Sequence, residues 1–385
     1  MPSPAFHPLT KAQRPEWLVR LGLVLGSLIV GLLALELALR TSYGYLLLWP
    51  NFVVSARTVL ADRDSSRYVH DGLLGYVPRP GSFGPDYSGP GAVIEAGGLR
   101  RTGDLPPAAT IATTVAETAR PILGPILAVG DSFTFGDEVG DTETWPAHLQ
   151  RLTGRRVLNG GVSGYGFDQI VLRAEALAAA LRPQAIVVGF IADDIRRTEM
   201  RRLWSADKPW FDLEGDRPVL RGVPVPPRAE PRSTLNFWQR TLGYSFLFEF
   251  TLRHLDLLHD WFGDHLRAGP SGSGEQLACR LTGRLAELQK KSGARLLIVA
   301  QYDPVVWQDP AFAAEQRRMT AQLLGCARQA GLETLDSFDV MAARAGKEGP
   351  RGFYGLWHMN DRGNRLIADT VAAALGKSDI GKHDK

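Results

Sequence analysis

The sequence is poor in cysteine and has no marked excess of either charge. Its 385 residues include only 2 cysteines, and 44 basic residues nearly balance 41 acidic ones, which gives a formal charge of +3. A nucleic-acid-binding protein normally carries a basic stripe, and this sequence has none. It also lacks the Cys/His spacing of a zinc site and the Gly/Lys motif that binds phosphate. These absences predict a protein that has no nucleic-acid partner, no metal and no cofactor.

The two cysteines, Cys279 and Cys326, are far apart in the sequence. Two buried thiols are one interpretation. A single disulfide is the other, and it requires an oxidising compartment around this part of the chain. The sequence leaves both interpretations open.

One long apolar run lies near the N-terminus. Residues Leu21–Leu39 are apolar except for Ser27 and Glu36, close to the roughly 20 residues that cross a bilayer. Basic residues precede the run, which favours a cytoplasmic N-terminus. A cleaved signal peptide and a buried core helix are the alternatives. We favour a single-pass membrane anchor, with residues 50–385 on the extracytoplasmic, periplasmic side.

Changes in composition divide the chain into an anchor, a Gly- and Pro-rich membrane-proximal linker, a main domain and a disordered tail, at residues 1–50, 51–120, 121–376 and 377–385. Within the main domain, residues 196–270 interrupt the pattern and are expected to form an insertion. It should contain a hairpin that turns at Gly215–Asp216, followed by an apolar helical stretch with breaks.

Short apolar strands alternate with helices in the main domain. The sequence predicts strands at 126–129, 185–191 and 295–301, separated by helices such as 167–182, which is rich in Ala and Leu. Uninterrupted apolar strands of this kind are typical of a parallel sheet that is covered by helices on both faces. We therefore expect an α/β fold with a mainly parallel sheet in a three-layer sandwich.

Polar residues and glycines follow several predicted strands, at the edge where open α/β sheets bind their ligands. They are Asp131, Ser132, Asn159, Gly160, Gly161, Gly164, Asp193 and Asp194, together with His358 and Asn360 before the last helix. Each has a simpler explanation when taken alone: a strand cap, a tight glycine turn, or a helix cap. Together they supply a hydroxyl, a base and backbone N–H groups, which is the material for acyl transfer.

Three blocks, "GDSFTFG", "NGGVSGYGFDQ" and "HMNDRGNRLIA", resemble the first, second and last blocks of the SGNH (GDSL-like) hydrolase superfamily, in the same order. The anchor followed by "LGYVPRPGSFG" resembles membrane-anchored bacterial members. The resemblance implies a flavodoxin-like fold, Ser132 as nucleophile and His358 as general base. It also implies that backbone N–H groups of Ser132 and Gly161 face the oxyanion, with Asp131, Asn159 and Asp194 in supporting positions.

The sequence departs from this family at two points. Asp193 replaces the usual asparagine of the third block, and an ionised carboxylate cannot donate a hydrogen bond to an oxyanion. The family's aspartate before the histidine is also missing, because Gly355 and Leu356 occupy those positions. The imidazole then needs a backbone carbonyl or another carboxylate, for which Asp336 and Asp339 are distant candidates.

These observations predict a serine esterase or O-acyltransferase that acts on a small ester or on an acylated glycan of the envelope. Envelope polysaccharide-assembly proteins are candidate partners. The alternative is a catalytically impaired module that binds glycan or assists its assembly. A metal-dependent hydrolase that uses Asp131, Asp193 and Asp194 is a third hypothesis, although a metal site would need further ligands.

Overall fold

The computed structural model describes residues 16–42, 67–85, 89–104, 124–203, 206–227, 237–243, 245–255, 257, 261 and 273–380. The chain divides into two compact units. One contains residues 1–59 and 233–262, and the other contains residues 60–232 and 263–385.

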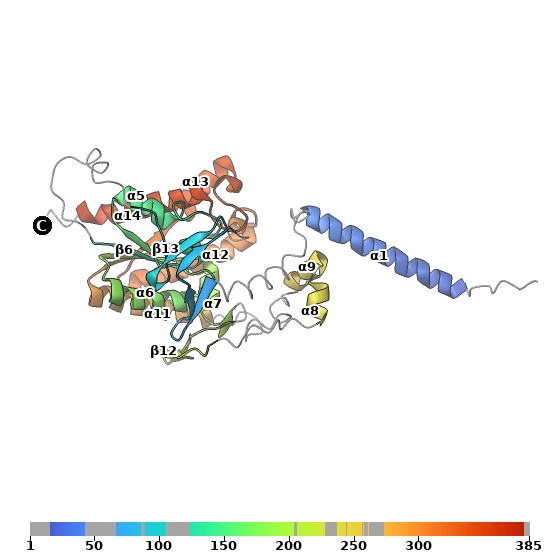
Figure 1. The fold of residues 1–385 in the computed structure, drawn as a ribbon, viewed down its shortest axis with the longest axis horizontal. Helices are drawn as coiled ribbons and strands as arrows, with labels where there is room; N and C mark the ends of the chain where they lie inside the picture. The colour runs from blue at the N-terminus through green and yellow to red at the C-terminus, as the bar shows by residue number, and fades with distance from the viewer. Residues whose placement is uncertain are drawn as a thin grey trace, which may run out of the picture. The chain divides into compact units, whose positions relative to one another are not determined.

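A central sheet organises the larger unit (Figure 1). Its parallel part comprises β6 (Ile126–Val129), β7 (Val157–Asn159), β8 (Ala185–Phe190), β13 (Arg295–Ala300) and β14 (Glu333–Asp336). These strands lie in the order β14-β13-β8-β6-β7, and each pairs in parallel with its neighbours. In chain order this is the 2-1-3-4-5 arrangement of flavodoxin-like folds. The prediction of an α/β fold with a mainly parallel sheet is confirmed.

Helices cover both faces of this sheet (Figure 1). One layer contains α6 (Phe167–Leu181), α11 (Ser273–Ser292) and α12 (Pro310–Gln329), and the other contains α5 (Trp145–Thr153), α13 (Phe338–Glu348) and α14 (Asp361–Ile380). Successive residues of β6 alternate between the layers: Leu127 and Val129 pack in one core, Ile126 and Ala128 in the other. Both faces are therefore buried, which explains the uninterrupted apolar strands. α14 continues to Ile380, past the predicted end of the domain at Gly376.

The segment before the first parallel strand differs from the expected linker. β3 (Gly81–Phe83), β4 (Ala92–Glu95) and β5 (Leu99–Arg100) extend the central sheet with antiparallel pairing, after a hairpin of β1 (Tyr68–Asp71) and β2 (Gly75–Pro78). A short 3₁₀ turn, η1 (Ala96–Gly98), joins β4 to β5. Strands of two to four residues between glycines and prolines are too short for a period-2 pattern to stand out. The sequence therefore resembles a loop although the backbone is paired.

The first part of the predicted insertion packs on the larger unit. It begins at the end of α7 (Ala192–Arg197) and contains β9 (Arg202–Leu203), β10 (Ala206–Asp207), and the hairpin of β11 (Trp210–Glu214) and β12 (Arg217–Arg221). The hairpin turns at Gly215–Asp216, as predicted, and Gly215 has a φ of +63°, which suits a two-residue hairpin loop. The buried ammonium of Lys208 donates to Asp168 Oδ2 of α6 at 2.5 Å, which ties this segment to the core.

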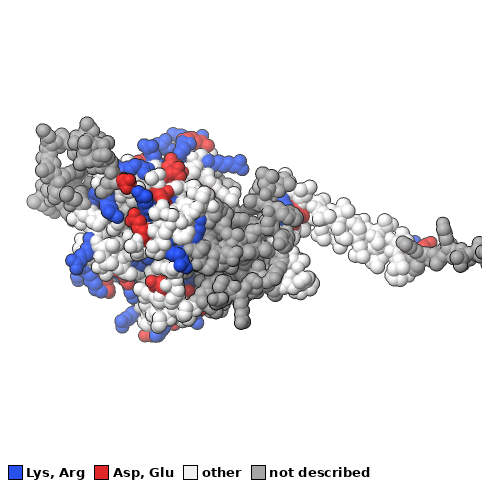
Figure 2. Space-filling model, in the orientation of Figure 1, with Lys and Arg blue, Asp and Glu red and all other residues white. Residues whose placement is uncertain are grey.

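The smaller unit contains α1 (Glu16–Ser42), α8 (Phe237–Leu242) and α9 (Phe246–His254). α1 is long and apolar enough to cross a membrane, with a mean hydropathy of 2.4 over its most apolar window. Figure 2 shows it white along its length, with charged residues only near its two ends. None of that window is buried, which argues against the alternative of a core helix.

A disulfide joins two helices of the larger unit. Cys279 of α11 and Cys326 of α12 are bonded, with their Cα atoms 5.4 Å apart. Of the two interpretations of these cysteines, the structure therefore has the disulfide.

Replacing both Cys279 and Cys326 by serine should lower the free energy of unfolding by about 4 kcal/mol, because the bridge closes a long loop in the unfolded chain. The bonded residues are 47 positions apart. Urea unfolding followed by tryptophan fluorescence measures the change. A reductant should destabilise the wild type similarly and leave the double variant unchanged. Equal midpoints for wild type and variant would contradict the prediction.

Candidate active site

Ser132 lies in a tight turn directly after β6. It begins the short helix α4 (Ser132–Phe135), whose N-cap is Asp131: the Asp131 carboxylate accepts a hydrogen bond from the backbone N–H of Phe133 at 2.9 Å. Gly136 ends the helix in the left-handed conformation, with a φ of +93°. The capping role expected of an aspartate at a strand end is therefore filled by Asp131, and the turn presents the next side chain, Ser132.

His358 meets Ser132 from the loop before α14. Its Nε2 lies 2.9 Å from Ser132 Oγ, although the two residues are 226 positions apart in the sequence. The Ser132 hydroxyl also lies 3.4 Å from Asp131 Oδ2, a longer and weaker contact. The hydroxyl has one proton, and the shorter distance favours its donation to the imidazole.

A third side chain, Glu138, holds the other nitrogen of His358. Its Oε1 lies 3.1 Å from His358 Nδ1. The same carboxylate accepts hydrogen bonds from the backbone N–H groups of Leu356 (2.7 Å) and Trp357 (2.9 Å). An ionised carboxylate only accepts, so the Nδ1 nitrogen carries the proton and Nε2 is left as the acceptor for Ser132.

Asp336 and Asp339 were the sequence's candidates for this partner, and the structure corrects them. The Asp336 carboxylate instead accepts from the Tyr302 hydroxyl and from the Phe338 backbone N–H, each at 2.9 Å. The carboxylate on His358 comes from the loop after the serine turn, only six positions beyond Ser132.

Gly355 leaves room for the Glu138 carboxylate, which explains why position 355 carries no aspartate. A Cβ atom on Gly355 would lie 2.3 Å from Glu138 Oε2. Any side chain at this position would therefore displace the carboxylate from the imidazole. The absence of a side chain at position 355 therefore leaves the space in which the Glu138 carboxylate lies beside the imidazole.

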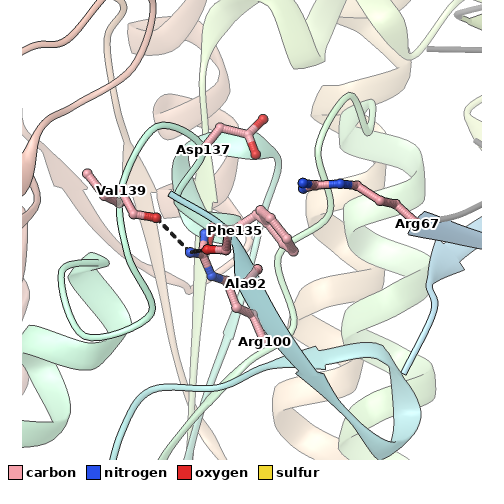
Figure 3. A pocket seen from close by; sticks show the side chains of 7 residues that line it. Arg67, Ala92, Arg100, Phe135, Asp137 and Val139 are labelled. Carbon is pink, nitrogen blue, oxygen red and sulfur yellow. Dashed lines mark hydrogen bonds between the residues drawn. The ribbon is translucent and has the colours of Figure 1, made fainter. Parts of the chain in front are cut away.

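Glu138 has an unusual backbone, which Arg100 helps to hold. Its φ is +72°, in the left-handed region that non-glycine residues rarely adopt. The buried guanidinium of Arg100 on β5 donates to the carbonyl groups of Phe135 (3.0 Å), Gly136 (2.6 Å) and Val139 (2.7 Å) and to the carboxylate of Asp141 (2.9 Å). Figure 3 shows Arg100 directed at this loop beside a cavity of about 10 Å³, which is too small for a substrate. The antiparallel extension of the sheet thus supports the loop that carries Glu138.

Glu138 and His358 shift each other's pKa values in opposite directions. Burial lowers the pKa of His358, but the hydrogen bond that its Nδ1–H donates to Glu138 and the charges of Asp137, Glu138 and Asp131 outweigh burial and raise it. Burial raises the pKa of Glu138, but its hydrogen bonds and its attraction to His358 outweigh burial and lower it. Glu138 therefore stabilises the protonated imidazole, which is the form that appears when a base has taken a proton.

The glycine loop after β7 packs against the serine turn. A Cβ atom on Gly161 would lie 2.3 Å from the backbone nitrogen of Phe135, so only glycine fits this approach. The Gly161 N–H donates to Asn159 Oδ1 at 3.0 Å, and Asn159 Nδ2 donates to Phe135 O at 3.2 Å. Asn159 therefore links the two loops.

Asp193 is turned toward basic side chains of its own helix. Its Oδ1 accepts from Arg196 at 2.7 Å, and its side chain is 43% exposed. The neighbouring Asp194 is fully buried: it accepts from the Ile191 N–H at 3.0 Å and from Arg197 at 2.7 Å.

Arg197 joins Asp194 to the serine turn, because its Nη1 also lies 3.7 Å from Asp131 Oδ2. Burial raises the pKa of both carboxyls, and the nearby Asp131 raises that of Asp194 further. Within the described part of the chain, no group of three or more His, Cys, Asp or Glu side chains is arranged to hold a metal ion. Asp131 and Asp194 act here as partners of an arginine.

Asp303 and Asn360 are two further polar residues of the candidate site. Asp303 follows β13 and accepts from the Val305 N–H at 2.8 Å, at the start of η2 (Pro304–Trp307). Burial raises the pKa of Asp303 to about 6, the charge of Asp193 raises it too, and His358 lowers it. Asn360 accepts from the Gly363 N–H at 3.1 Å and so fills the capping role at the start of α14.

Sequence reasoning missed three of these residues: Glu138, Asp303 and Arg100. Asp303 carried a usable signal, because it is a polar residue just after a predicted strand, like Asp131. Arg100 carried none, since its segment has the Gly- and Pro-rich composition expected of a linker. Glu138 lay within an acidic stretch that has no distinguishing pattern.

A serine, a histidine and a glutamate bonded in series at the carboxyl edge of a flavodoxin-like sheet form the constellation of an α/β ester hydrolase. Residues 128–366 match the GDSL-like lipase/acylhydrolase family, and the chain belongs to that family. Its members hydrolyse ester bonds. None of the curated protein sequences matches the chain significantly.

Solved structures of similar fold include three hydrolases of low sequence identity. An alpha/beta hydrolase from the metagenome of Lake Arreo, Spain, is 14% identical, with 66% of this chain and 95% of that chain covered and a TM-score of 0.41. A lipase/acylhydrolase from Enterococcus faecalis is also 14% identical, with coverages of 66% and 95% and a TM-score of 0.36. An acetyl xylan esterase from Geobacillus stearothermophilus is 12% identical, with coverages of 66% and 94% and a TM-score of 0.36.

Proposed function

We propose that the protein is a membrane-anchored, extracytoplasmic serine esterase or O-acyltransferase, with Ser132 as nucleophile, His358 as base and Glu138 as the residue that orients the base. The observation that carries the proposal is the bonded series Ser132 Oγ–His358 Nε2 (2.9 Å) and His358 Nδ1–Glu138 Oε1 (3.1 Å). Both distances lie in the range expected of an assembled nucleophile and base.

In the first half-reaction, Ser132 Oγ attacks the acyl carbon while its proton moves to His358 Nε2. The carbonyl π electrons move to oxygen and form a tetrahedral oxyanion. When the oxyanion collapses, the bond to the leaving alcohol breaks and His358 gives its proton to that alcohol. The result is an acyl-serine and a free hydroxyl compound, and Glu138 stabilises the imidazolium in between.

In the second half-reaction, His358 deprotonates the incoming hydroxyl group, which attacks the acyl-serine. The bond between the acyl carbon and Ser132 Oγ then breaks, and His358 returns the proton to Oγ. Water gives the free acid, whereas a sugar hydroxyl gives a new ester, and both regenerate Ser132. The same residues therefore serve hydrolysis and transfer, and the acceptor decides between them.

The oxyanion is proposed to bind the backbone N–H groups of Ser132 and Gly161. The Gly161 N–H donates to Asn159 Oδ1 in the free protein, so substrate binding has to replace or share that bond. Asp193 adds no donor while it is ionised and paired with Arg196. This oxyanion site is weaker than one with a third, amide donor.

The surroundings of His358 favour an uncharged acyl group. Asp131, Asp137 and Glu138 all act electrostatically on the imidazole, and Asp303 lies within its field. An anionic substrate would be repelled here. The proposed substrate is therefore a neutral short-chain ester such as an O-acetyl group, carried by an envelope glycan. The apolar α1 and the Cys279–Cys326 disulfide support an extracytoplasmic position.

Purified full-length protein in detergent micelles tests the proposal. It should release acid from a neutral acetyl ester, and a serine-directed phosphonate should label Ser132, as located by peptide mass spectrometry. A Ser132→Ala variant serves as the control for labelling. Failure to label under conditions in which an active family member is labelled would overturn the hydrolase assignment.

A second function is favoured by one observation: neither Asp193 nor the already bonded Gly161 N–H offers a free donor to an oxyanion. On this view the domain is a catalytically impaired module that binds acylated glycan during envelope assembly. Glycan binding that survives Ser132→Ala, with no turnover by the wild type, would establish this second function.

Replacing Asp193 by asparagine should raise kcat for ester hydrolysis by roughly tenfold or more, since it adds an amide donor where one donor is typically worth about 10²–10³ in rate. Steady-state kinetics with a neutral acetyl ester measure the change. Arg196→Gln is the matched control, because it breaks the same ion pair without adding a donor at position 193. An unchanged or lower kcat for Asp193→Asn would contradict the prediction.

A further inference from the structure

Two short apolar helices belong with the N-terminal helix and not with the hydrolase unit. α8 and α9 fall in the same compact unit as α1, although some 200 positions separate them in the sequence. α9 packs against α1 near the C-terminal end of that helix.

The contact is made by Glu36, the one acidic residue in the apolar run of α1. Its Oε1 accepts from the Phe246 N–H at 2.7 Å, and its Oε2 accepts from the Leu247 N–H at 2.8 Å and from Ser245 Oγ at 2.9 Å. Arg40 donates to the same carboxylate at 2.6 Å. Glu36 thus caps the first turn of α9, where a negative charge is stabilised by the unpaired N–H groups of the helix.

This contact fixes the depth of α9 if α1 spans a bilayer. Glu36 lies three positions before the end of the apolar run at Leu39. With a rise of about 1.5 Å per residue, it lies roughly 5 Å inside the boundary of the apolar core. A helix bonded to Glu36 must therefore begin at the boundary between acyl chains and headgroups.

The side chains exposed on α8 and just after α9 suit that boundary. Phe237 is 71% exposed, Trp238 62%, Leu255 60% and Leu257 44%, whereas Phe246 and Leu252 are buried. Phe237 and Trp238 also pack edge to face, with ring centroids 5.3 Å apart. Aromatic rings of this kind are enriched at the headgroup level of membranes. In the larger unit, the exposed large apolar side chains are instead scattered singly along the chain.

We propose that α8, α9 and the following Leu255 and Leu257, here called the interfacial helix pair, lie in the headgroup region of the outer leaflet. Phe237 and Trp238 insert among the acyl chains, and Glu36 holds the pair at this depth. The inference rests on the proposed anchoring by α1. It adds a second membrane contact from the middle of the sequence, so that the hydrolase unit is tethered to the bilayer both before its first strand and through its insertion.

Depth-dependent quenching tests this placement in the full-length protein, reconstituted in vesicles of phosphatidylethanolamine and phosphatidylglycerol. The two native cysteines are bonded to each other, so a single introduced cysteine can be labelled with an environment-sensitive dye. Trp238→Cys reports on the interfacial helix pair, and Leu28→Cys reports on the middle of α1. Lipids carrying a nitroxide either near the headgroup or near the bilayer centre serve as quenchers.

The label at position 238 should be quenched about twofold more by the shallow nitroxide than by the deep one, as expected for insertion of roughly 5–10 Å. The label at position 28 should show the reverse order. Adding Glu36→Ala should reduce quenching at position 238, and Glu36→Gln, which keeps one acceptor oxygen, should reduce it less.

The label at position 28 tests the membrane anchor, and the label at position 238 tests the interfacial helix pair. No quenching at position 28 would contradict the proposal that α1 spans the membrane. Quenching at position 28 without quenching at position 238 would overturn the interfacial helix pair while the anchor stands. Shielding of position 238 that depends on protein concentration instead of lipid quencher would assign the exposed face to a second copy of the chain, and would overturn the proposal as well.

Discussion

Ser132→Ala should lower kcat for hydrolysis of a neutral acetyl ester by roughly 10⁴–10⁶-fold, because no acyl-serine can then form. The Ser132 hydroxyl contacts the imidazole directly, at 2.9 Å from His358 Nε2. The fold should survive, since removing one buried hydroxyl of this kind costs only about 1 kcal/mol. Initial rates measure the loss, and thermal unfolding of the same sample checks the fold.

Ser163→Ala is the matched control for this variant. Ser163 lies in the glycine loop after β7, and its Oγ is buried without a hydrogen-bond partner among the described residues. Its removal should leave kcat within about threefold of the wild type. Activity of Ser132→Ala within about tenfold of the wild type would mean that the nucleophile lies elsewhere.

Glu138→Gln should lower kcat by roughly 10²–10⁴-fold, which is the scale seen when the carboxylate of a serine triad is lost. The amide keeps the size of the side chain but removes the charge that stabilises the imidazolium. It can also present its NH₂ group to Nδ1, which would favour the tautomer with the proton on Nε2. In that tautomer His358 cannot accept the Ser132 proton.

The pH profile distinguishes this role from a merely structural one. Catalysis needs neutral His358, so kcat/KM falls as the pH drops through the pKa of the imidazole. Glu138 raises that pKa, although burial alone would lower it. Without the charge, the pKa falls and the acidic limb of the profile should move to lower pH, while the maximum rate decreases. An unmoved limb would contradict a direct interaction between Glu138 and the base.

Gly355→Ala provides an independent test of the same contact. Its new methyl group would lie 2.3 Å from Glu138 Oε2, so it should displace the carboxylate without altering its chemistry. The variant should share both effects of Glu138→Gln, the lower kcat and the shifted limb. Gly352→Ala, in η3 (Pro350–Gly352), has 3.5 Å of space to its nearest neighbour and is the matched glycine control.

The sequence predicts the parallel part of the sheet, and it offers Ser132 and His358 as members of the candidate site. Ser132 and His358 lie in blocks whose residue order is distinctive, and the apolar strands between them are long enough to show a pattern. Both are local properties of the chain.

Glu138 could not be predicted in the same way. It is 220 positions from His358, and its contact depends on a left-handed backbone that its residue type disfavours. The space for its carboxylate is created by the absence of a side chain at Gly355, which is a property of two loops together. The strands β3–β5 escaped prediction because they are too short for periodicity, and β5 joins the central sheet only through the pairing of Arg100 with Asn159 of β7.

Glu36 also bears on how this protein can be handled in solution. Deleting the N-terminal helix is the usual route to a water-soluble form of an anchored enzyme, but here it would remove the acceptor for the Phe246 and Leu247 N–H groups. The truncated chain would retain Phe237, Trp238 and Leu255 as exposed apolar side chains beside an uncapped helix. Such a fragment should self-associate, whereas replacing residues 233–262 by a short polar linker in the same truncation should keep it monomeric.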